Sequence, residues 1–329
     1  MQQPIFYLGP FQGITDVHYR RLFVDYFGGV LKLFTPFFTG IDTENSKSLH
    51  TPELNIQLSN PETTIPQLLS KNADELVRFA TQCDRIGYHE VNWNLGCPYP
   101  RVAKKMRGSG LLPFPDLIDQ VLDHYFSNCS VRLSIKCRLG LITEDEFDLL
   151  IPVFNRYPIT ELIVHARTGV QMYKGEVHIV KLKDAFPMIK HPVVYNGDVF
   201  NSLSFDTIKS FLPDVSVMML GRGVLSDPFL ASDLKGSAID KERADHLKNF
   251  LTDLFLSRIN AGSQAYTGIG KMKELWTYLR WSFDDPIQVW RLVRKSATVQ
   301  EYMESVNMVF DRFSFTGQGY GKTVEVTKD

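Results

Sequence analysis

Cysteine is scarce in this sequence. The four cysteines are Cys83, Cys97, Cys129 and Cys137, and no two of them show the Cys-x-x-Cys spacing. The sequence therefore indicates neither a disulfide framework nor a zinc site. We expect no bound metal ion and a reducing, cytoplasmic environment.

Long hydrophobic runs and a surplus of one charge are also missing. No stretch of about 18 apolar residues occurs, and the first residues lack a basic region before an apolar run, so we expect no membrane span and no signal peptide. Lys and Arg number 36 against 37 Asp and Glu, a formal net charge of −1. This balance excludes a basic coat over the whole surface but leaves room for a local basic patch. With 44% hydrophobic and 22% charged residues, the composition is globular.

Short apolar runs of strand length recur along the first two thirds of the chain. Most lack polar alternation, as is typical of parallel strands buried on both faces. The runs are Ile5–Gly9, Leu31–Thr35, Thr64–Leu68, Glu90–Asn94, Arg132–Lys136, Glu161–His165, Val193–Asn196 and Ser216–Gly221. Helical spacing of apolar residues separates several of them, at Ala73–Ile86, Pro115–Phe126, Glu144–Phe154 and Ser202–Leu212. The alternation predicts an α/β fold, a (β/α)8 TIM barrel, with a doubly wound open sheet as the alternative.

The pattern changes after Leu230. The polar segment Ser232–Arg243 is typical of a linker, and no strand-like run follows it. Helices are predicted at Ala244–Ile259, Gly270–Phe283, Pro286–Lys295 and Val299–Phe313. We therefore expect a barrel over residues 1–235, a small helical bundle domain over 240–317 and a flexible tail over 318–329. We expect a monomer.

Polar residues end most of the predicted strands. In a barrel, these ends converge on one mouth, where ligands bind. Strand termini commonly turn polar, so each residue alone is a weak signal. The combination of Lys, His, Gln and Asn is stronger, because Asp and Ser are the more usual exits. The residues are Gln67, Asn94, Lys136, His165 and Asn196, with Gly221 and Arg222 after the last strand.

Two glycine-containing turns follow the last two strands. They are Asn196-Gly197-Asp198 and Gly221-Arg222-Gly223. Glycine lets the backbone approach an anion closely, and Arg222 adds a guanidinium fork. Loops at this position of a barrel commonly grip phosphate, so the pair favours a phosphate-bearing cofactor.

Cys97 lies in the turn Asn94-Leu95-Gly96-Cys97-Pro98, which places its thiol at the barrel mouth. It could act as a nucleophile or as a proton donor. No His or Asp lies close in sequence to form a thiolate pair, and an ordinary thiol, with a pKa of about 8.5, stays protonated at neutral pH. A proton donor suits these properties better.

The sequence allows two roles each for Lys136 and His165. Lys136 could form a Schiff base, as in an aldolase, or could stabilise an anion on a cofactor ring. A lone histidine such as His165 is more often structural than catalytic, but the converging strand ends make a functional role comparable.

Basic residues cluster locally. Arg101, Lys104, Lys105 and Arg107 follow Cys97 directly. Lys271, Lys273 and Arg280 lie on one predicted helix, with Arg291, Arg294 and Lys295 on the next and aromatic residues between them. These residues form either a solvated helix face around an aromatic core or a surface that binds the phosphate backbone of a nucleic acid.

Six motifs in order make the sequence resemble the tRNA-dihydrouridine synthase family from Gly9 to about Arg294. The family's Ala-Pro-Met-x-Gly-x-Thr-Asp is similar to Gly9–Asp16, its Asn-x-Gly-Cys-Pro to Asn94–Pro98, and its Lys-x-Arg-x-Gly to Lys136–Gly140. Its His-x-Arg-Thr and Tyr-x-Gly are similar to His165–Thr168 and Tyr173–Gly175, and the turns at Asn196–Asp198 and Gly221–Gly223 complete the set.

The resemblance implies an FMN enzyme that NADPH recharges. It implies that Gln67, Lys136 and His165 hold the flavin ring above Pro10, Phe11 and Gln12. Asn196, Gly197, Asp198, Gly221 and Arg222 would hold the ribityl and phosphate groups. Cys97 would be the general acid that protonates C5 of a uridine in tRNA while C6 receives a hydride, giving 5,6-dihydrouridine. The substrate-binding residues would be Asn94, Arg101, Arg138, Arg167, Tyr173, Lys271, Lys273, Arg280, Arg291 and Arg294.

The sequence also departs from the family pattern. Phe11 replaces the usual Met, and the segment Met106–Gly110 is more basic than usual. The residues Gly270–Trp276 and Tyr278–Arg280 resemble the bacterial C-type subgroup, which is associated with uridine 16 of the D loop.

Three other functions fit parts of the sequence. A flavin barrel that reduces a free pyrimidine or another small enone would explain the barrel and Cys97 but not the helical module. A Schiff-base aldolase would use Lys136. A non-catalytic tRNA-binding chaperone would not need Cys97.

Overall fold

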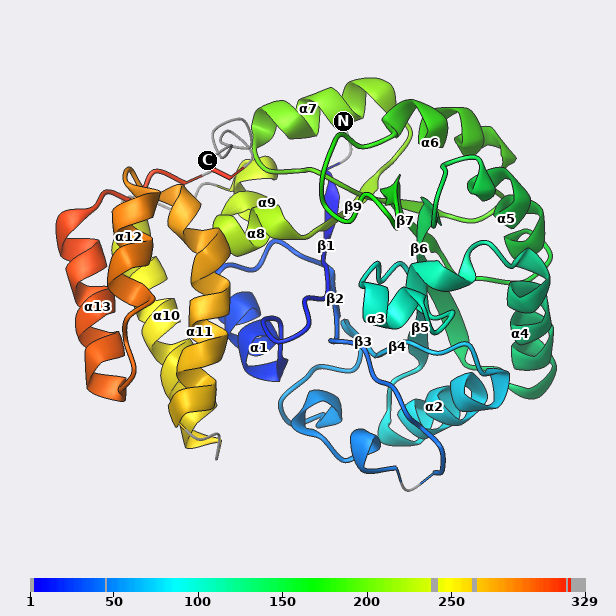
Figure 1. Cartoon of the computed structure of the whole chain (residues 1–329), viewed down its shortest axis with the longest axis horizontal. Helices are drawn as coiled ribbons and strands as arrows, with labels where there is room; N and C mark the ends of the chain where they lie inside the picture. The colour runs from blue at the N-terminus through cyan, green and yellow to red at the C-terminus, as the bar shows by residue number, and fades with distance from the viewer. Residues whose placement is uncertain (1–2, 45, 238–241, 262–264, 318, 321–329) are drawn as a thin grey trace.

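The computed structural model describes residues 3–44, 46–237, 242–261, 265–317 and 319–320 and contains one parallel sheet that curls into a barrel (Figure 1). The sheet order is β3-β2-β1-β9-β8-β7-β6-β5-β4. The strands are β1 (Ile5–Leu8), β2 (Lys32–Phe34), β3 (Thr64–Ile65), β4 (Gln67–Leu68), β5 (Glu90–Leu95), β6 (Arg132–Gly140), β7 (Leu162–Thr168), β8 (Val193–Asn196) and β9 (Val217–Leu220).

The two ends of this sheet are halves of one predicted run. Pro66, which has no N–H to donate, separates β3 from β4. β3 pairs with β2 on one side and β4 pairs with β5 on the other. The sheet therefore closes on itself, which confirms the predicted barrel over the open sheet.

Helices surround the barrel. The predicted stripe of α2 is buried at Leu76, Phe79, Ala80 and Cys83, and the helix ends at Gly87, whose φ of 117° suits glycine. The α-helices of this part are α1 (Val17–Tyr26), α2 (Ala73–Ile86), α3 (Pro100–Ala103), α4 (Pro115–Asn128), α5 (Glu146–Phe154), α6 (Ile179–Ala185), α7 (Ser202–Phe211), α8 (Arg222–Ser226) and α9 (Leu230–Leu234). Short 3-10 turns are η1 (Lys47–Leu49), η2 (Pro52–Leu54), η3 (Gly108–Leu111) and η4 (Phe186–Met188).

The C-terminal helices form a bundle beside α1 and α8 (Figure 1). They are α10 (Arg243–Asn260), α11 (Ala265–Leu279), α12 (Pro286–Val293) and α13 (Val299–Arg312), with the 3-10 turn η5 (Arg280–Ser282). Trp276 and Tyr302 lie in the bundle core, where Nε1 of Trp276 donates to the Tyr302 hydroxyl at 3.2 Å. The predicted linker starts inside α9, and residues 238–241 lie outside the described part, so the boundary at 235–240 stays a prediction.

Asp16 joins the bundle to the barrel. This buried carboxylate begins α1 by accepting from the Tyr19 N–H at 3.0 Å. Nε of Arg258 and Nζ of Lys271 donate to it, each at 3.0 Å. Burial opposes ionisation of Asp16, but Arg258 and Lys271 outweigh it and hold the carboxyl pKa below its ordinary value. Lys271 is partly exposed and its ammonium is already paired with Asp16, so its predicted contact with tRNA stays a prediction.

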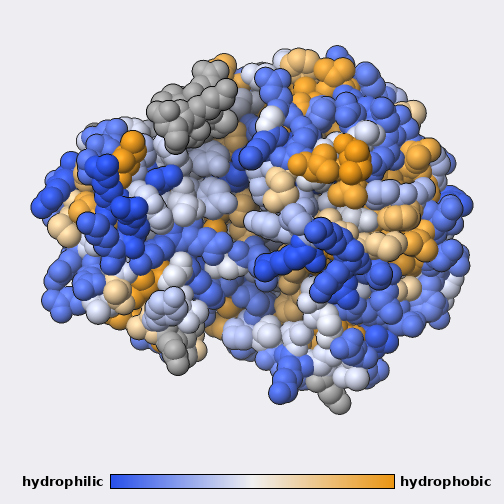
Figure 2. All heavy atoms as spheres, viewed as in Figure 1, coloured by the Kyte–Doolittle hydropathy of each residue, from blue (hydrophilic) through white to orange (hydrophobic). Residues whose placement is uncertain are grey.

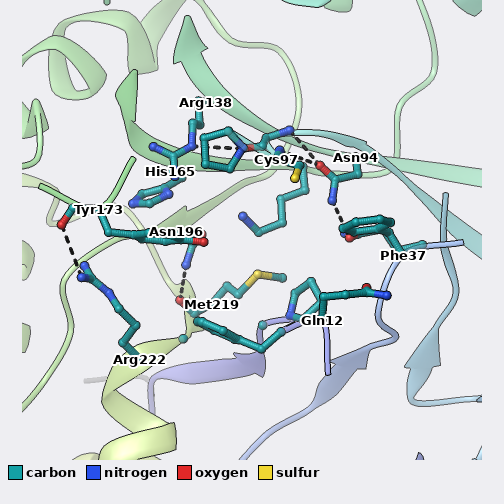
Figure 3. A pocket seen from close by; sticks show the side chains of 18 of the residues that line it. Gln12, Phe37, Asn94, Cys97, Arg138, His165, Tyr173, Asn196, Met219 and Arg222 are labelled. Carbon is teal, nitrogen blue, oxygen red and sulfur yellow. Dashed lines mark hydrogen bonds between the residues drawn. The ribbon is translucent and has the colours of Figure 1, made fainter. Parts of the chain in front are cut away.

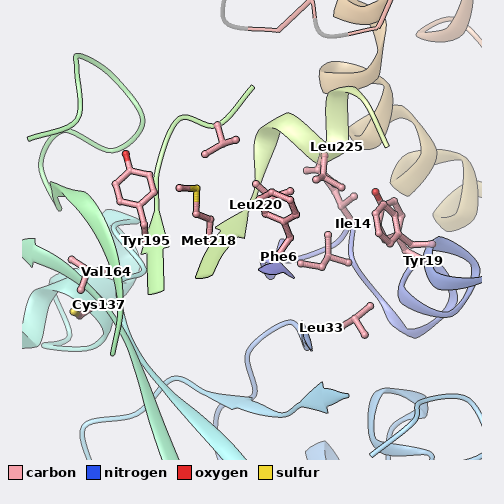
Figure 4. Packing of buried hydrophobic residues seen from close by; sticks show 14 of the residues in the cluster. Phe6, Ile14, Tyr19, Leu33, Cys137, Val164, Tyr195, Met218, Leu220 and Leu225 are labelled. Atoms are coloured by element: carbon pink, nitrogen blue, oxygen red, sulfur yellow. The ribbon is translucent and has the colours of Figure 1, made fainter. Parts of the chain in front are cut away.

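Two cores hold the barrel. Figure 4 shows the outer core, where Phe6, Leu220 and Leu225 pack toward Ile14 and Tyr19 of the N-terminal segment. A smaller inner core fills the barrel with Tyr7, Phe34, Ile65, Ile163, Val194 and Met219. At the amino ends of the strands, Lys32 contacts Glu90 and Glu161, each at 3.1 Å. The space for a ligand therefore lies at the carboxyl ends.

After α13 the chain first contacts η5 of the bundle, where the Thr316 N–H donates to the Ser282 carbonyl at 2.8 Å. It then reaches the barrel, where the ring of Tyr320 lies 5.2 Å from that of Phe200. Of the predicted flexible tail, residue 318 and residues 321–329 lie outside the described part. Among the described helices, none has the length and apolar character to cross a bilayer.

Candidate active site

A cavity opens at the carboxyl ends of the strands (Figure 3). Cys97 lines it together with all eleven residues predicted to bind the cofactor: Pro10, Phe11, Gln12, Gln67, Lys136, His165, Asn196, Gly197, Asp198, Gly221 and Arg222. Asn94, Arg138 and Tyr173 of the predicted substrate residues line it as well. Residues more than 200 positions apart in sequence thus meet around one mouth, as the barrel predicts.

A directed chain of amide hydrogen bonds crosses the barrel interior below Cys97. Oδ1 of Asn94 accepts from the N–H groups of Gly96 and Cys97, so its Nδ2 must donate, and it does so to Oε1 of Gln67 at 2.7 Å. Nε2 of Gln67 then donates to Asn92 at 2.8 Å, and Asn92 donates to Ser134 at 2.9 Å. Because each amide has one donor end and one acceptor end, the chain fixes the orientation of Gln67 and Asn94.

The loop that carries Cys97 is held from several sides. The N–H and hydroxyl of Ser109 both donate to the Cys97 carbonyl, at 3.1 and 3.2 Å. Gly108 has a φ of 56°, and a Cβ there would lie 2.6 Å from the Cys97 carbonyl oxygen. Nε of Arg138 donates to the Gly96 carbonyl at 3.0 Å. The thiol is therefore presented from a fixed backbone.

Cys97 is 8% exposed, and the surroundings of its thiol favour the protonated form. Burial raises the pKa of Cys97 and outweighs the Tyr99 N–H, Arg138 and Lys136, which all act to lower it. A thiol that keeps its proton at neutral pH suits an acid rather than a nucleophile.

Lys136 brings an unpaired cation into the cavity. Its Nζ forms no hydrogen bond or ion pair within the part of the chain that the structure describes. Burial, with the nearby charge of Arg138 adding to it, lowers the pKa of Lys136 to about 8. An ammonium group in this position lacks an anionic partner, which a ligand would supply.

His165 is buried and neutral. Burial, with Arg138 and Lys136 adding to it, lowers the pKa of His165 well below its ordinary value. A guanidinium nitrogen of Arg167 lies 3.3 Å from Nε2 of His165. Because a guanidinium only donates, Nε2 accepts and the ring proton is on Nδ1.

Arg167 is buried, and its guanidinium contacts other residues of the chain rather than solvent. It is 1% exposed, and its guanidinium forms an ion pair with Asp198 and donates to the Gly175 carbonyl. Nη2 of Arg222 also donates to Asp198, at 2.6 Å. We therefore correct the predicted role of Arg167 from substrate contact to positioning, since it locks the turns that follow β7, β8 and β9.

Tyr173 connects two of the cavity cations. The guanidinium carbons of Arg138 and Arg222 lie 5.4 and 5.1 Å from the centre of its ring. Burial lowers the pKa of Arg138 to about 10, which still leaves the group charged at neutral pH. Both arginines stack on this ring with their charge beside the cavity.

The residues of the cavity fit a flavin mononucleotide. An apolar floor of Pro10, Phe11 and Met219 suits a planar ring, and Lys136 offers an unpaired cation for the charge of a reduced ring. Arg222 and the turns around Gly197 and Gly221 suit a phosphate tail. No cluster of metal-ligating side chains occurs in the described part of the chain.

The model of the dihydrouridine synthase family matches residues 7–312 of this chain. The chain belongs to the dihydrouridine synthase family. It is 27% identical over 240 residues to tRNA-dihydrouridine synthase B of Pasteurella multocida, covering 72% of this chain and 70% of that protein. It is 30% identical over 239 residues to tRNA-dihydrouridine(16) synthase of Neisseria meningitidis, covering 69% and 70%. It is 25% identical over 269 residues to tRNA-dihydrouridine synthase B of Vibrio cholerae, covering 79% and 80%.

The dihydrouridine synthases are oxidoreductases, and this chain is an enzyme of that class. Membership of this family decides between functions that the residues alone left open. The barrel with Cys97 at its mouth belongs to a reductase, so an aldolase that uses Lys136 and a non-catalytic chaperone are both disfavoured. Relatives carry both the B name and the 16 name, so the C-type subgroup stays a prediction.

In this synthase, several predicted tRNA-binding residues lie away from the cavity. Arg101 is exposed on α3, Lys273 is partly exposed on α11, and Arg291 and Arg294 are exposed at α12. Arg280 stacks on Trp281 and Trp290, with its guanidinium carbon 4.7 and 5.5 Å from their ring centres. Figure 2 shows hydrophilic side chains over the C-terminal helices and around the centre of the face that contains the mouth. A role in tRNA binding stays a prediction for these residues.

Sequence reasoning missed part of the cavity wall. Glu274 and Tyr278 of α11 line the cavity, as do Phe37 and Tyr99. Glu274 and Tyr278 are four residues apart on one helix, a spacing that places them on one face, but no pattern within α11 indicates that this face meets the barrel. Tyr99 stood two residues after Cys97, and its position there was a usable signal.

Proposed function

We propose that this protein is a tRNA-dihydrouridine synthase that reduces the C5=C6 bond of a D-loop uridine. We further propose that this uridine is uridine 16. The Cys97 thiol carries the proposal. It lies at the mouth of a barrel beside an unpaired cation, and its raised pKa keeps it protonated. The relatives' names and the matched family support the tRNA substrate.

FMN is the proposed cofactor and NADPH the proposed reductant. A reduced flavin in the cavity would supply the hydride that C6 of the uridine receives. Lys136 would stabilise negative charge on the ring, and Gln67 would help to hold the ring. Arg222, with the turns at Gly197 and Gly221, would hold the ribityl and phosphate groups.

Cys97 completes the reduction by protonating C5. Its Sγ gives up the proton as the new C–H bond forms, and solvent restores the thiol after product release. The amide chain through Asn94 holds the thiol in place during the transfer, and Arg138 holds the same loop through the Gly96 carbonyl.

A uridine in folded tRNA must leave its stack to reach this mouth. The basic residues Arg101, Lys273, Arg291 and Arg294 are the proposed contacts for the phosphate backbone around the extruded nucleotide. A monomer in the cytoplasm, where tRNA is modified, is the simplest form of the enzyme under this proposal.

Titration of the purified protein with tRNA at several salt concentrations tests the substrate. We expect the logarithm of the affinity to fall linearly with the logarithm of the salt concentration, because phosphate contacts release counterions. Dihydrouridine formation from the same tRNA and from free uridine monophosphate is then compared. Reduction of the free nucleotide with no salt-dependent tRNA binding would favour a small-molecule reductase and contradict the proposal.

A further inference from the structure

Helix α11 of the bundle forms part of the active-site wall. Lys271, Glu274 and Tyr278 are spaced three and four residues apart, which places them on one face of this helix. Lys271 is anchored to Asp16 at 3.0 Å, and the Tyr278 ring lies 5.8 Å from that of Phe11. The Asp16 contact thus fixes Glu274 at the mouth of the cavity.

The carboxylate of Glu274 rests against the loop that follows β1. A Cβ at Gly13 would lie 2.8 Å from Oε2 of Glu274, so the glycine leaves room for this side chain. In the part of the chain that the structure describes, no group donates a hydrogen bond or forms an ion pair with this carboxylate. Burial raises the pKa of Glu274, while Arg258 and Lys271 act to lower it.

Glu274 differs in charge from its neighbours. Lys136, Arg138 and Arg222 make the cavity lining cationic, and the other lining acid, Asp198, is paired with arginines. A lone carboxylate repels the phosphates that the cations attract. A carboxylate binds RNA by accepting a hydrogen bond. The donors that a nucleotide offers are base N–H groups and the ribose 2′-OH.

The depth of the cavity favours the ribose. A base that reacts must approach Cys97, which is 8% exposed, whereas Glu274 is an exposed residue at the rim. The sugar of an extruded nucleotide stays at the rim while its base is inside. The 2′-OH is also the group that distinguishes RNA from DNA.

We propose that Glu274 is a specificity-determining residue that accepts a hydrogen bond from the 2′-OH of the extruded uridine. The inference rests on the proposed function and adds to it a contact that selects a ribonucleotide. It gives the helical bundle a part in recognition inside the active site as well as any role on the tRNA body.

The test uses full-length, flavin-loaded protein and two tRNAs that differ only in having uridine or 2′-deoxyuridine at the modified position. The rate of dihydrouridine formation is measured at subsaturating tRNA. We expect wild type to prefer the ribose by about tenfold or more, because a hydrogen bond to a charged group is worth about 1.5–3 kcal/mol. Glu274→Ala should lose about the same factor on the ribose tRNA and show a ratio near one.

Two further variants sharpen the comparison. Glu274→Gln keeps an acceptor oxygen and should retain part of the ribose preference. Glu304→Ala removes an exposed carboxylate from α13, outside the cavity, and should behave as wild type, which separates a local contact from a change in overall charge.

The outcomes are distinguishable. If Glu274→Ala retains the full ribose preference, or if it loses activity while wild type shows no ribose preference, this inference is overturned and the proposed function stands. Loss of flavin absorbance from Glu274→Ala would instead assign the residue to cofactor binding and also overturn it. Wild type that forms no dihydrouridine in the ribose tRNA contradicts the proposed function, and this inference with it.

Discussion

Asn94 fixes the backbone of Cys97: its Oδ1 accepts a hydrogen bond from the Cys97 N–H at 2.9 Å. The same oxygen accepts from Gly96, and the amide nitrogen of Asn94 donates to Gln67. One side chain thus connects the proposed acid to a residue proposed to hold the flavin ring, so the positions of thiol and cofactor are set by the same amide chain.

Replacing Asn94 should impair proton transfer more than flavin binding, because the Cys97 N–H loses its acceptor while Gln67 keeps its hydrogen bond to Asn92. In Asn94→Ala the Cys97 loop loses its acceptor, and a displacement of about 1 Å can cost about a hundredfold in rate. We expect dihydrouridine formation to fall by about that factor while the flavin stays bound, as read from its visible absorbance. Asn128→Ala, at the exposed end of α4, is the matched control. Unchanged rates in Asn94→Ala would contradict the positioning role.

The raised pKa of Cys97 predicts the pH dependence of the rate. An acid must be protonated to act, so activity at saturating flavin should be level through neutral pH and fall only above the ordinary thiol pKa of about 8.5. Cys97→Ala should lose about a hundredfold or more in single-turnover rate and should still bind flavin and tRNA. A rate that rises with pH through the same range would mean that the thiolate is the active form.

Lys136 should make flavin binding pH-dependent. Its pKa of about 8 means that the cation is present below that pH and is lost as the pH rises through it. Flavin affinity, measured by fluorescence quenching, should therefore weaken above pH 8 in wild type. Lys136→Met should bind flavin about tenfold more weakly at neutral pH and show no such inflection, whereas the exposed Lys190→Met should match wild type. An inflection that survives in Lys136→Met would assign it to another group.

Gly108 offers a test of the loop geometry. Gly108→Ala places a Cβ 2.6 Å from the Cys97 carbonyl oxygen at a residue with a φ of 56°. Gly40→Ala meets a similar φ of 72° but no atom within 4 Å. Positive φ alone costs roughly 1–2 kcal/mol. We expect Gly40→Ala to lose only thermal stability and Gly108→Ala to lose both stability and dihydrouridine formation. Equal activity in the two variants would show that the Cys97 loop tolerates the displacement.

The barrel was predictable because its signal is local. Continuous apolar runs mark strands buried on both faces, and the polar residues in their later halves could be assigned to one mouth from sequence alone. Asn196 ends β8 as predicted, whereas β6 and β7 run beyond Lys136 and His165, to Gly140 and Thr168. The barrel geometry, rather than any contact between them, brings these residues together.

What the sequence could not show in the site has a common cause. Lys271 and Arg167 are paired with Asp16 and Asp198, which lie 255 and 31 positions away in the chain. Glu274 and Tyr278 were missed because their place in the cavity depends on how the bundle docks against the barrel. A sequence shows where the charged residues are, but it shows their ion-pair partners only where those partners are close in the chain.

We propose that this cavity reduces a uridine in tRNA with Cys97 as the proton donor. The most direct test of this proposal incubates the flavin-loaded protein with NADPH and unmodified tRNA, followed by mass mapping of the product. We expect the gain of two hydrogen atoms at a single D-loop uridine with wild type and none with Cys97→Ala. Unchanged tRNA with flavin-loaded wild type, or the same product from Cys97→Ala at the wild-type rate, would contradict the proposal.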